Sequence, residues 1–172
     1  MKTILLIAIF AAMCFDVEAE LKEVDPEIVC NLLADDGLEM NSFGWRKHTM
    51  GCMTNIKRFT SNEMKMALTY TVRGHEHNNK NVRLNLIGAA SVKLTLNAFV
   101  KKGNEGSVNY DELVNKTIKI SGVLAGQVLP DEVIASIRKG EAIEVNLNGT
   151  IITVSERIWR SDEIYELQVV FK

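Results

Sequence analysis

The chain has 172 residues, of which 47% are hydrophobic, with 20 basic and 22 acidic side chains and a formal net charge of −2. This length and apolar content are those of a globular chain that can bury a sizeable core. The small net charge, without a long run of one sign, argues against nucleic acid or an anionic membrane as the main partner.

The N-terminal segment has the layout of a cleaved secretory signal. Lys2 precedes an apolar run over residues 4–13, and Val17 and Ala19 supply the β-branched and small positions before a cleavage site. The apolar run is too short to cross a bilayer. We therefore expect residues 1–19 to be removed as a signal peptide.

Residues 20–172 are expected to form a single domain, exported to the periplasm or secreted. Cys30 and Cys52 are the two cysteines of this domain. Disulfides persist outside the cytoplasm, so we expect these two to pair, with a stabilisation of roughly 3 kcal/mol from the shorter loop in the unfolded state. In an alternative reading Cys14 carries a lipid anchor, but the bulky Met13 occupies a position that requires a small residue.

The first elements are a helix and a loop. A capping carboxylate and a proline predict a helix over residues 25–37, with Ile28 and Leu32 facing inward. The stretch 39–52 has no clear periodicity, and we expect a loop that the disulfide ties to this helix, with a short strand within it as an alternative.

Two alternating segments follow. Residues 64–72 and 82–86 alternate between apolar and polar side chains, which predicts an antiparallel hairpin. A helix is expected next, over residues 91–102. Its apolar residues at helical spacing are Val92, Leu96 and Phe99.

The C-terminal half contains the clearest local signals. A long helix is predicted from Asn109, and a short helix over residues 130–140 has a proline and acids at its start and bases and a glycine at its end. Asn148-Gly149 lies between two alternating runs, a strong signal for a β-hairpin over residues 143–154.

The chain ends with a turn over residues 159–163 and a last strand over residues 165–171. The strands fall in antiparallel sets, with the helices between them. The order of elements predicts an α+β fold: a single antiparallel sheet of about five strands, with segregated helices packed on one face and one disulfide.

Motifs for chemistry are sparse. His75 and His77 could share a metal ion or assist a hydrolase, but a stable site needs a third ligand, and a solvated polar turn is the simpler interpretation. No serine lies in a nucleophile elbow. Neither a catalytic residue nor a cofactor is expected.

Two aromatic segments are candidates for partner binding. Phe43, Trp45 and Arg46 lie in the disulfide-tied loop, and Trp159 and Arg160 precede the last strand. Tryptophan and arginine dominate binding hot spots. The alternative is that the tryptophans belong to the core, which is the commoner role in a small domain.

Two Asn-x-Thr sequons begin at Asn115 and Asn148. They could carry glycans only in a eukaryotic host. We prefer their structural interpretations, as helix and hairpin-turn residues.

Several segments together support a resemblance. They are Cys30 and Cys52, Thr69–Gly74, Val82–Ile87, Leu129-Pro130 with Ser136-Ile137 and Gly140, and Trp159 with Tyr165-Glu166-Leu167. On these residues the chain resembles a family of small exported bacterial proteins of undetermined function. The resemblance implies bacterial export and one α+β domain, and it implies no catalytic residues.

The absence of catalytic motifs favours one class of function. We expect a non-catalytic periplasmic protein that binds another protein, such as an inhibitor, an immunity protein or an envelope accessory factor. The alternative is a small periplasmic metal-binding protein or hydrolase built on His75 and His77.

Overall fold

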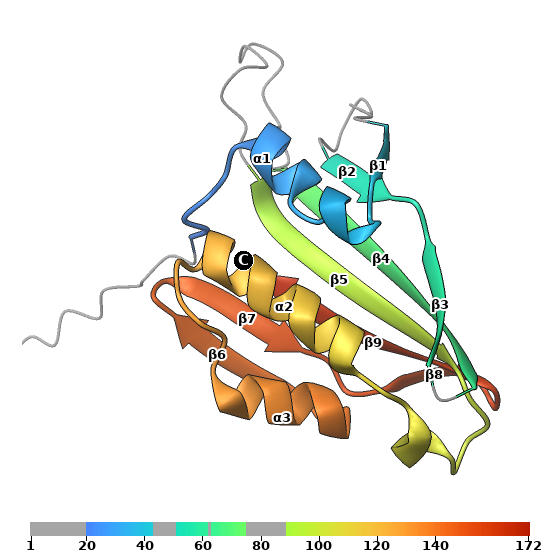
Figure 1. Ribbon diagram of the computed structural model, residues 1–172. Coiled ribbons are helices and arrows are strands. Elements are labelled where there is room, and N and C mark those ends of the chain that lie inside the picture. Colours follow the sequence, from blue (N-terminus) through green and yellow to red (C-terminus); the bar gives the residue numbers. More distant parts are fainter. Residues whose placement is uncertain (1–19, 43–50, 62, 75–88) are drawn as a thin grey trace, which may run out of the picture.

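The computed structural model describes residues 20–42, 51–61, 63–74 and 89–172 (Figure 1). The described strands form one antiparallel sheet of nine strands, more than the five or so that the sequence predicts. The strands are β1 (Met40–Ser42), β2 (Gly51–Thr54), β3 (Lys57–Ser61), β4 (Met64–Gly74), β5 (Ala89–Phe99), β6 (Ile143–Leu147), β7 (Thr150–Val154), β8 (Ile158–Ser161) and β9 (Ile164–Phe171). The α+β class and the antiparallel pairing are confirmed.

The helices lie on one side of this sheet (Figure 1). They are α1 (Pro26–Asn31), α2 (Asp111–Leu124) and α3 (Asp131–Lys139), with short 3₁₀ turns η1 (Ala34–Asp36) and η3 (Glu105–Ser107). We call the side with the helices the inner face and the opposite side the outer face. The core lies between α2 and the inner face, where Leu68, Leu96 and Ile120 are fully buried.

The strand order is β1-β2-β4-β5-β9-β7-β6, with β3 also beside β4 and β8 also beside β9. β2 pairs with residues 71–73 of β4, whereas β3 pairs with residues 64–68 of the same strand. In the same way, β7 and β8 pair with opposite ends of β9. One end of the sheet therefore has the local order β3-β4-β5-β9-β8.

Strand β5 corrects the helix predicted over residues 91–102. Val92, Leu94, Leu96 and Ala98 are all buried, and they alternate along the strand. Val92 and Leu96 are four residues apart, a spacing that returns to the same face in both a strand and a helix. Phe99 then falls on the outer face. The predicted hairpin strand at 82–86 lies outside the described residues, and among them β4 pairs with β5 as well as with β2 and β3.

Helix α1 begins as expected. Asp25 Oδ1 accepts a hydrogen bond from the Glu27 backbone N–H at 2.8 Å, and Pro26 occupies the first turn. The α-helix ends at Asn31, earlier than predicted, and η1 continues toward residue 37. The expectation for Ile28 is wrong, since its side chain is 50% exposed.

The disulfide between Cys30 and Cys52 is confirmed, with Cα atoms 6.1 Å apart. It joins α1 to β2. The Tyr70 hydroxyl of β4 donates a hydrogen bond to the Val29 carbonyl at 2.7 Å, next to the disulfide. Burial raises the pKa of Tyr70 well above its usual value, so the hydroxyl stays protonated as this donor. These two links hold α1 on the inner face.

The C-terminal helix and hairpin follow the local signals. Helix α3 ends at Gly140, which has the left-handed φ of 65°. In the β6–β7 hairpin, Asn148 and Gly149 have φ of 57° and 94°, as a type I′ turn requires. The predicted register, with Val145 opposite Ile152, is confirmed.

The predicted turn over residues 159–163 is a strand for most of its length. Ile158 pairs with Glu166 and Trp159 with Tyr165, so β8 and β9 form a hairpin. Its turn is confined to the two residues between these strands, Asp162 and Glu163. The register shifts between Trp159 and Ser161.

Candidate functional site

The outer face at the β3-β4-β5-β9-β8 end of the sheet carries two rows of side chains from five strands. The strand registers define both rows. The row nearer the strand ends contains Thr60, Lys65, Phe99 and Ile164. The second row contains Arg58, Ala67, Asn97, Glu166 and Ile158. Each row brings together residues from distant parts of the chain, because side chains at paired positions share a face.

Exposed or half-buried apolar side chains lie within these rows. Phe99 is 46% exposed and Ile158 is 37% exposed, and Ile164 lies half-buried opposite Phe99. We call the set Arg58, Lys65, Phe99, Ile158 and Ile164 the Phe99 surface. An exposed aromatic beside other apolar residues is the kind of patch that marks binding sites.

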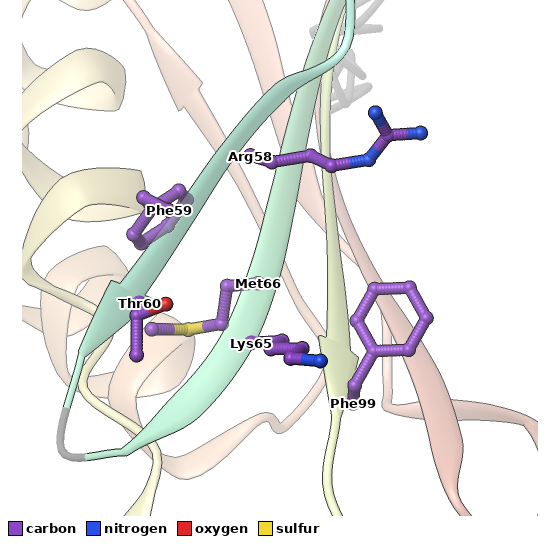
Figure 2. A pocket seen from close by; sticks show the side chains of 6 residues that line it. All are labelled: Arg58, Phe59, Thr60, Lys65, Met66 and Phe99. Atoms are coloured by element: carbon purple, nitrogen blue, oxygen red, sulfur yellow. The ribbon is translucent and has the colours of Figure 1, made fainter.

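A hollow of about 430 Å³ lies beside Phe99. Its lining residues are Arg58, Phe59, Thr60, Lys65, Met66 and Phe99. Figure 2 shows Arg58 and Phe99 on the side of the strands away from Phe59. The strand registers explain this division, because Phe59 pairs with the buried Met66 of the inner face. The hollow therefore has an aromatic wall and two cationic side chains on the outer face.

The two cations of the hollow have no carboxylate partner within the described part of the chain. The basic residues that form ion pairs in the described part of the chain are Lys57, Lys116, Lys119, Arg138, Lys139 and Arg160. Neither Arg58 nor Lys65 is among them. Their charges remain available to an anionic partner.

Trp159 and Arg160 point in different directions. Arg160 Nη2 lies 3.2 Å from Glu166 Oε2, so its charge is already paired at the edge of the Phe99 surface. Trp159 is half-buried and packs on the Tyr165 ring, with centroids 5.2 Å apart and planes at 63°. This packing accounts for the position of Trp159 without a partner. A contact between Trp159 and a partner stays a prediction.

A second group of aromatic and basic residues lies on the inner face. We call Tyr110, Arg157, Trp159 and Tyr165 the tyrosine cluster. The hydroxyls of Tyr110 and Tyr165 share a hydrogen bond of 2.5 Å, and Arg157 Nε donates to Tyr110 Oη at 3.2 Å. The Arg157 guanidinium lies 5.8 Å from the Tyr165 ring centroid.

Arg157 also connects this cluster to α3. Its Nη2 donates to the carbonyl of Lys139 at the C-terminus of α3, where a cation is favourable. Desolvation, and then the hydrogen bond with Tyr110, raise the pKa of Tyr165 well above its usual value. Tyr165 is fully buried and stays protonated. Through these contacts the tyrosine cluster joins β9 to the start of α2 and the end of α3.

A third group consists of charged residues between η1 and α2. Asp36 lies 2.8 Å from both Lys116 and Lys119, and Lys116 also lies 3.6 Å from Glu112. The hydrogen bonds from Lys116 and Lys119 hold the pKa of the Asp36 carboxyl below its usual value. The acidic and basic side chains of this group pair with one another, and these ion pairs connect η1 to α2.

Other predicted site residues lie outside the described residues. They are Phe43, Trp45 and Arg46 of the first aromatic segment, and His75 and His77 of the candidate metal site. Within the described ranges, no group of three or more His, Cys, Asp or Glu residues could hold a metal ion. Partner binding by Phe43, Trp45 and Arg46 stays a prediction, as does the solvated polar turn expected at His75 and His77, with a metal site there as the alternative.

Phe99, Arg58 and Lys65 are not among the site residues predicted from the sequence. The signal for them is in β5, where the buried apolar residues stand at even positions from 92 to 98 and Phe99 stands at an odd position, which the strand otherwise fills with polar side chains from 91 to 97. An aromatic residue at one of the alternate positions of a strand that otherwise hold polar side chains indicates an apolar side chain exposed to solvent. Arg157 was missed because nothing local distinguishes it from other surface arginines.

Comparison of the chain with family models, with curated proteins and with solved structures gives no match in any of the three. None of the described helices has the length and apolar character of a membrane span.

Proposed function

We propose that this protein is an exported, non-catalytic binding protein that acts through contacts with another protein. The observation that carries the proposal is the Phe99 surface. It combines an exposed aromatic, a hollow and two cations that form no ion pair with a described residue, on a face that no described helix covers.

The N-terminal segment and the disulfide support export. Residues 1–19 have the pattern of a secretory signal, and the Cys30–Cys52 bond is of a kind that persists in oxidising compartments. A periplasmic or secreted location fits both features.

The geometry favours binding over catalysis at this place. The groups that line the hollow beside Phe99 are a guanidinium, an ammonium, the Thr60 hydroxyl and apolar side chains. Among the described residues, neither a base beside this hydroxyl nor a group of metal ligands accompanies them. Rigid strands position the surface, which suits recognition of a folded or extended partner.

Site-specific crosslinking tests the proposal. A photoreactive phenylalanine analogue in place of Phe99 should form one discrete adduct with a partner in cells that export the protein. The matched control places the same analogue at Asn115, which is exposed on α2 on the inner side. Equal adducts from both positions, or none from Phe99, would contradict the proposal.

A further inference from the structure

We infer that the Phe99 surface binds an acidic segment of the partner protein. In this arrangement an apolar side chain of the segment packs against Phe99, and its carboxylates contact Arg58 and Lys65. This inference rests on the proposed function and adds the chemistry of the partner.

The position of Phe99 between its neighbours defines the arrangement. Along its row, Phe99 has Lys65 of β4 on one side and Ile164 of β9 on the other. Arg58 of β3 and Ile158 of β8 lie at opposite ends of the next row. The surface thus has an apolar side toward β9 and β8 and a cationic side toward β4 and β3.

The basic side chains on the two sides differ in whether they form an ion pair with a described residue. On the apolar side, Arg160 is paired with Glu166. On the cationic side, Arg58 and Lys65 have no such partner among the described residues. Glu63 and Glu163 lie nearby in hairpin turns, and no ion pair joins either of them to these cations.

A partner that covers Phe99 must also remove water from these cations. Burying a charge without a counter-charge is costly, whereas a carboxylate provides a strong charge-assisted hydrogen bond. A neutral or basic segment would therefore bind more weakly than an acidic one, and charge complementarity would also speed association.

A protein segment fits this surface better than an anionic bilayer. Asn97 and Thr60 lie within the two rows, and their side chains offer hydrogen-bond donors and acceptors that a peptide backbone can use and lipid tails cannot. The net charge of the whole chain is −2, which opposes approach to an anionic bilayer.

Peptide selection tests the chemistry directly. A random-peptide display library is selected against the mature protein, and we expect enrichment of peptides with acidic residues next to one large apolar residue. The double variant R58E/K65E should lose these peptides, with affinity about tenfold or more lower by calorimetry, and the affinity of the mature protein should fall as salt rises. F99A should lose the preference for the apolar residue.

The matched control is R73E/K93E, which makes the same change of charge on the outer face near the other end of β4 and β5. This control should bind the selected peptides like the unchanged protein. Thermal unfolding of every variant is measured, so that a folding defect is separated from a binding defect.

The outcomes distinguish this inference from the proposed function. Selected peptides without an acidic bias, or with affinity unchanged in R58E/K65E, would overturn the inference while position-specific crosslinking from Phe99 still supported protein binding. Binding to phosphatidylglycerol vesicles that R58E/K65E abolishes, without enrichment of acidic peptides, would also overturn it and indicate a lipid surface instead.

Discussion

Aromatic and cationic side chains gather on both faces of the sheet around β5 and β9, and the two groups differ in whether their cations have partners among the described residues. On the inner face, Tyr165 packs opposite Ala98, and Arg157 is bound by a hydroxyl and a helix carbonyl. On the outer face, Phe99 and the cations beside it are exposed to solvent and unpaired within the described chain.

Under the proposed function, this contrast assigns stability to the inner face and recognition to the outer face. The tyrosine cluster has satisfied its hydrogen bonds internally, so its contribution is to hold α2 and α3 on the sheet. The cations of the Phe99 surface have no ion pair among the described residues and stay exposed to solvent, as the proposed binding requires. Under this proposal, the same residue types serve different purposes on the two faces of the sheet.

Tyr165→Ala should produce the largest loss of stability. Removing a fully buried ring that contacts Trp159 and Arg157 should lower the free energy of unfolding by about 3–5 kcal/mol. Tyr165→Phe keeps the ring and should cost only about 1–2 kcal/mol through the lost hydrogen bond. Urea unfolding measures both, and equal stability of the two variants would show that the ring does not matter.

Removal of the disulfide should have the next largest effect. The double variant Cys30→Ser with Cys52→Ser should lose roughly 3 kcal/mol of stability, because the unfolded chain is no longer constrained. The Phe99 surface should keep its affinity for selected peptides, since no residue of it contacts the disulfide. Lost peptide binding in a variant that remains folded would contradict the separation between the two regions.

Asp36→Asn should cost about 1 kcal/mol at neutral pH, the size expected of a partly buried ion-pair group. The folded-state pKa of Asp36 lies below its ordinary value of 3.8, so the contribution is present above that value and is lost as the pH falls through the folded-state pKa. The stability of the variant should therefore depend less on pH in this acidic range. Urea unfolding over a pH series checks this, and parallel profiles would refute it.

Phe99→Ala should have the smallest effect on stability, within about 0.5 kcal/mol, because much of the ring is already in water. Leu96→Ala, on the same strand but buried on the inner face, should cost about 2–5 kcal/mol. Thermal unfolding of this pair sharpens the contrast between the two faces. A large loss from Phe99→Ala would mean that the outer face is part of the core.

Local signals predicted much of the C-terminal half. Helix α3 depends on a proline, on charges at both ends and on the glycine at 140, all within ten or so residues. The β6–β7 register depends on Asn148 and Gly149, which can adopt a positive φ. In such segments the backbone preference of a few residues agrees with the tertiary structure.

The candidate site could not be predicted in the same way. The Phe99 surface exists only because β3, β4, β5, β8 and β9 lie in register, and the apolar spacing in residues 91–102 predicts a helix where the structure has β5. Apolar side chains four residues apart share a face in both a strand and a helix. Only the pairing of this segment with β4 on one side and β9 on the other decides that it is a strand.

The sequence by itself determined the export signal pattern, the cysteine pair, the boundaries of α3 and the register of one hairpin, because each depends on neighbouring residues or on elimination. Tertiary structure alone decided that Phe99 faces solvent and that Arg157 joins two tyrosines. These outcomes depend on strand pairing and helix packing between residues far apart in the chain, where local preference carries no information.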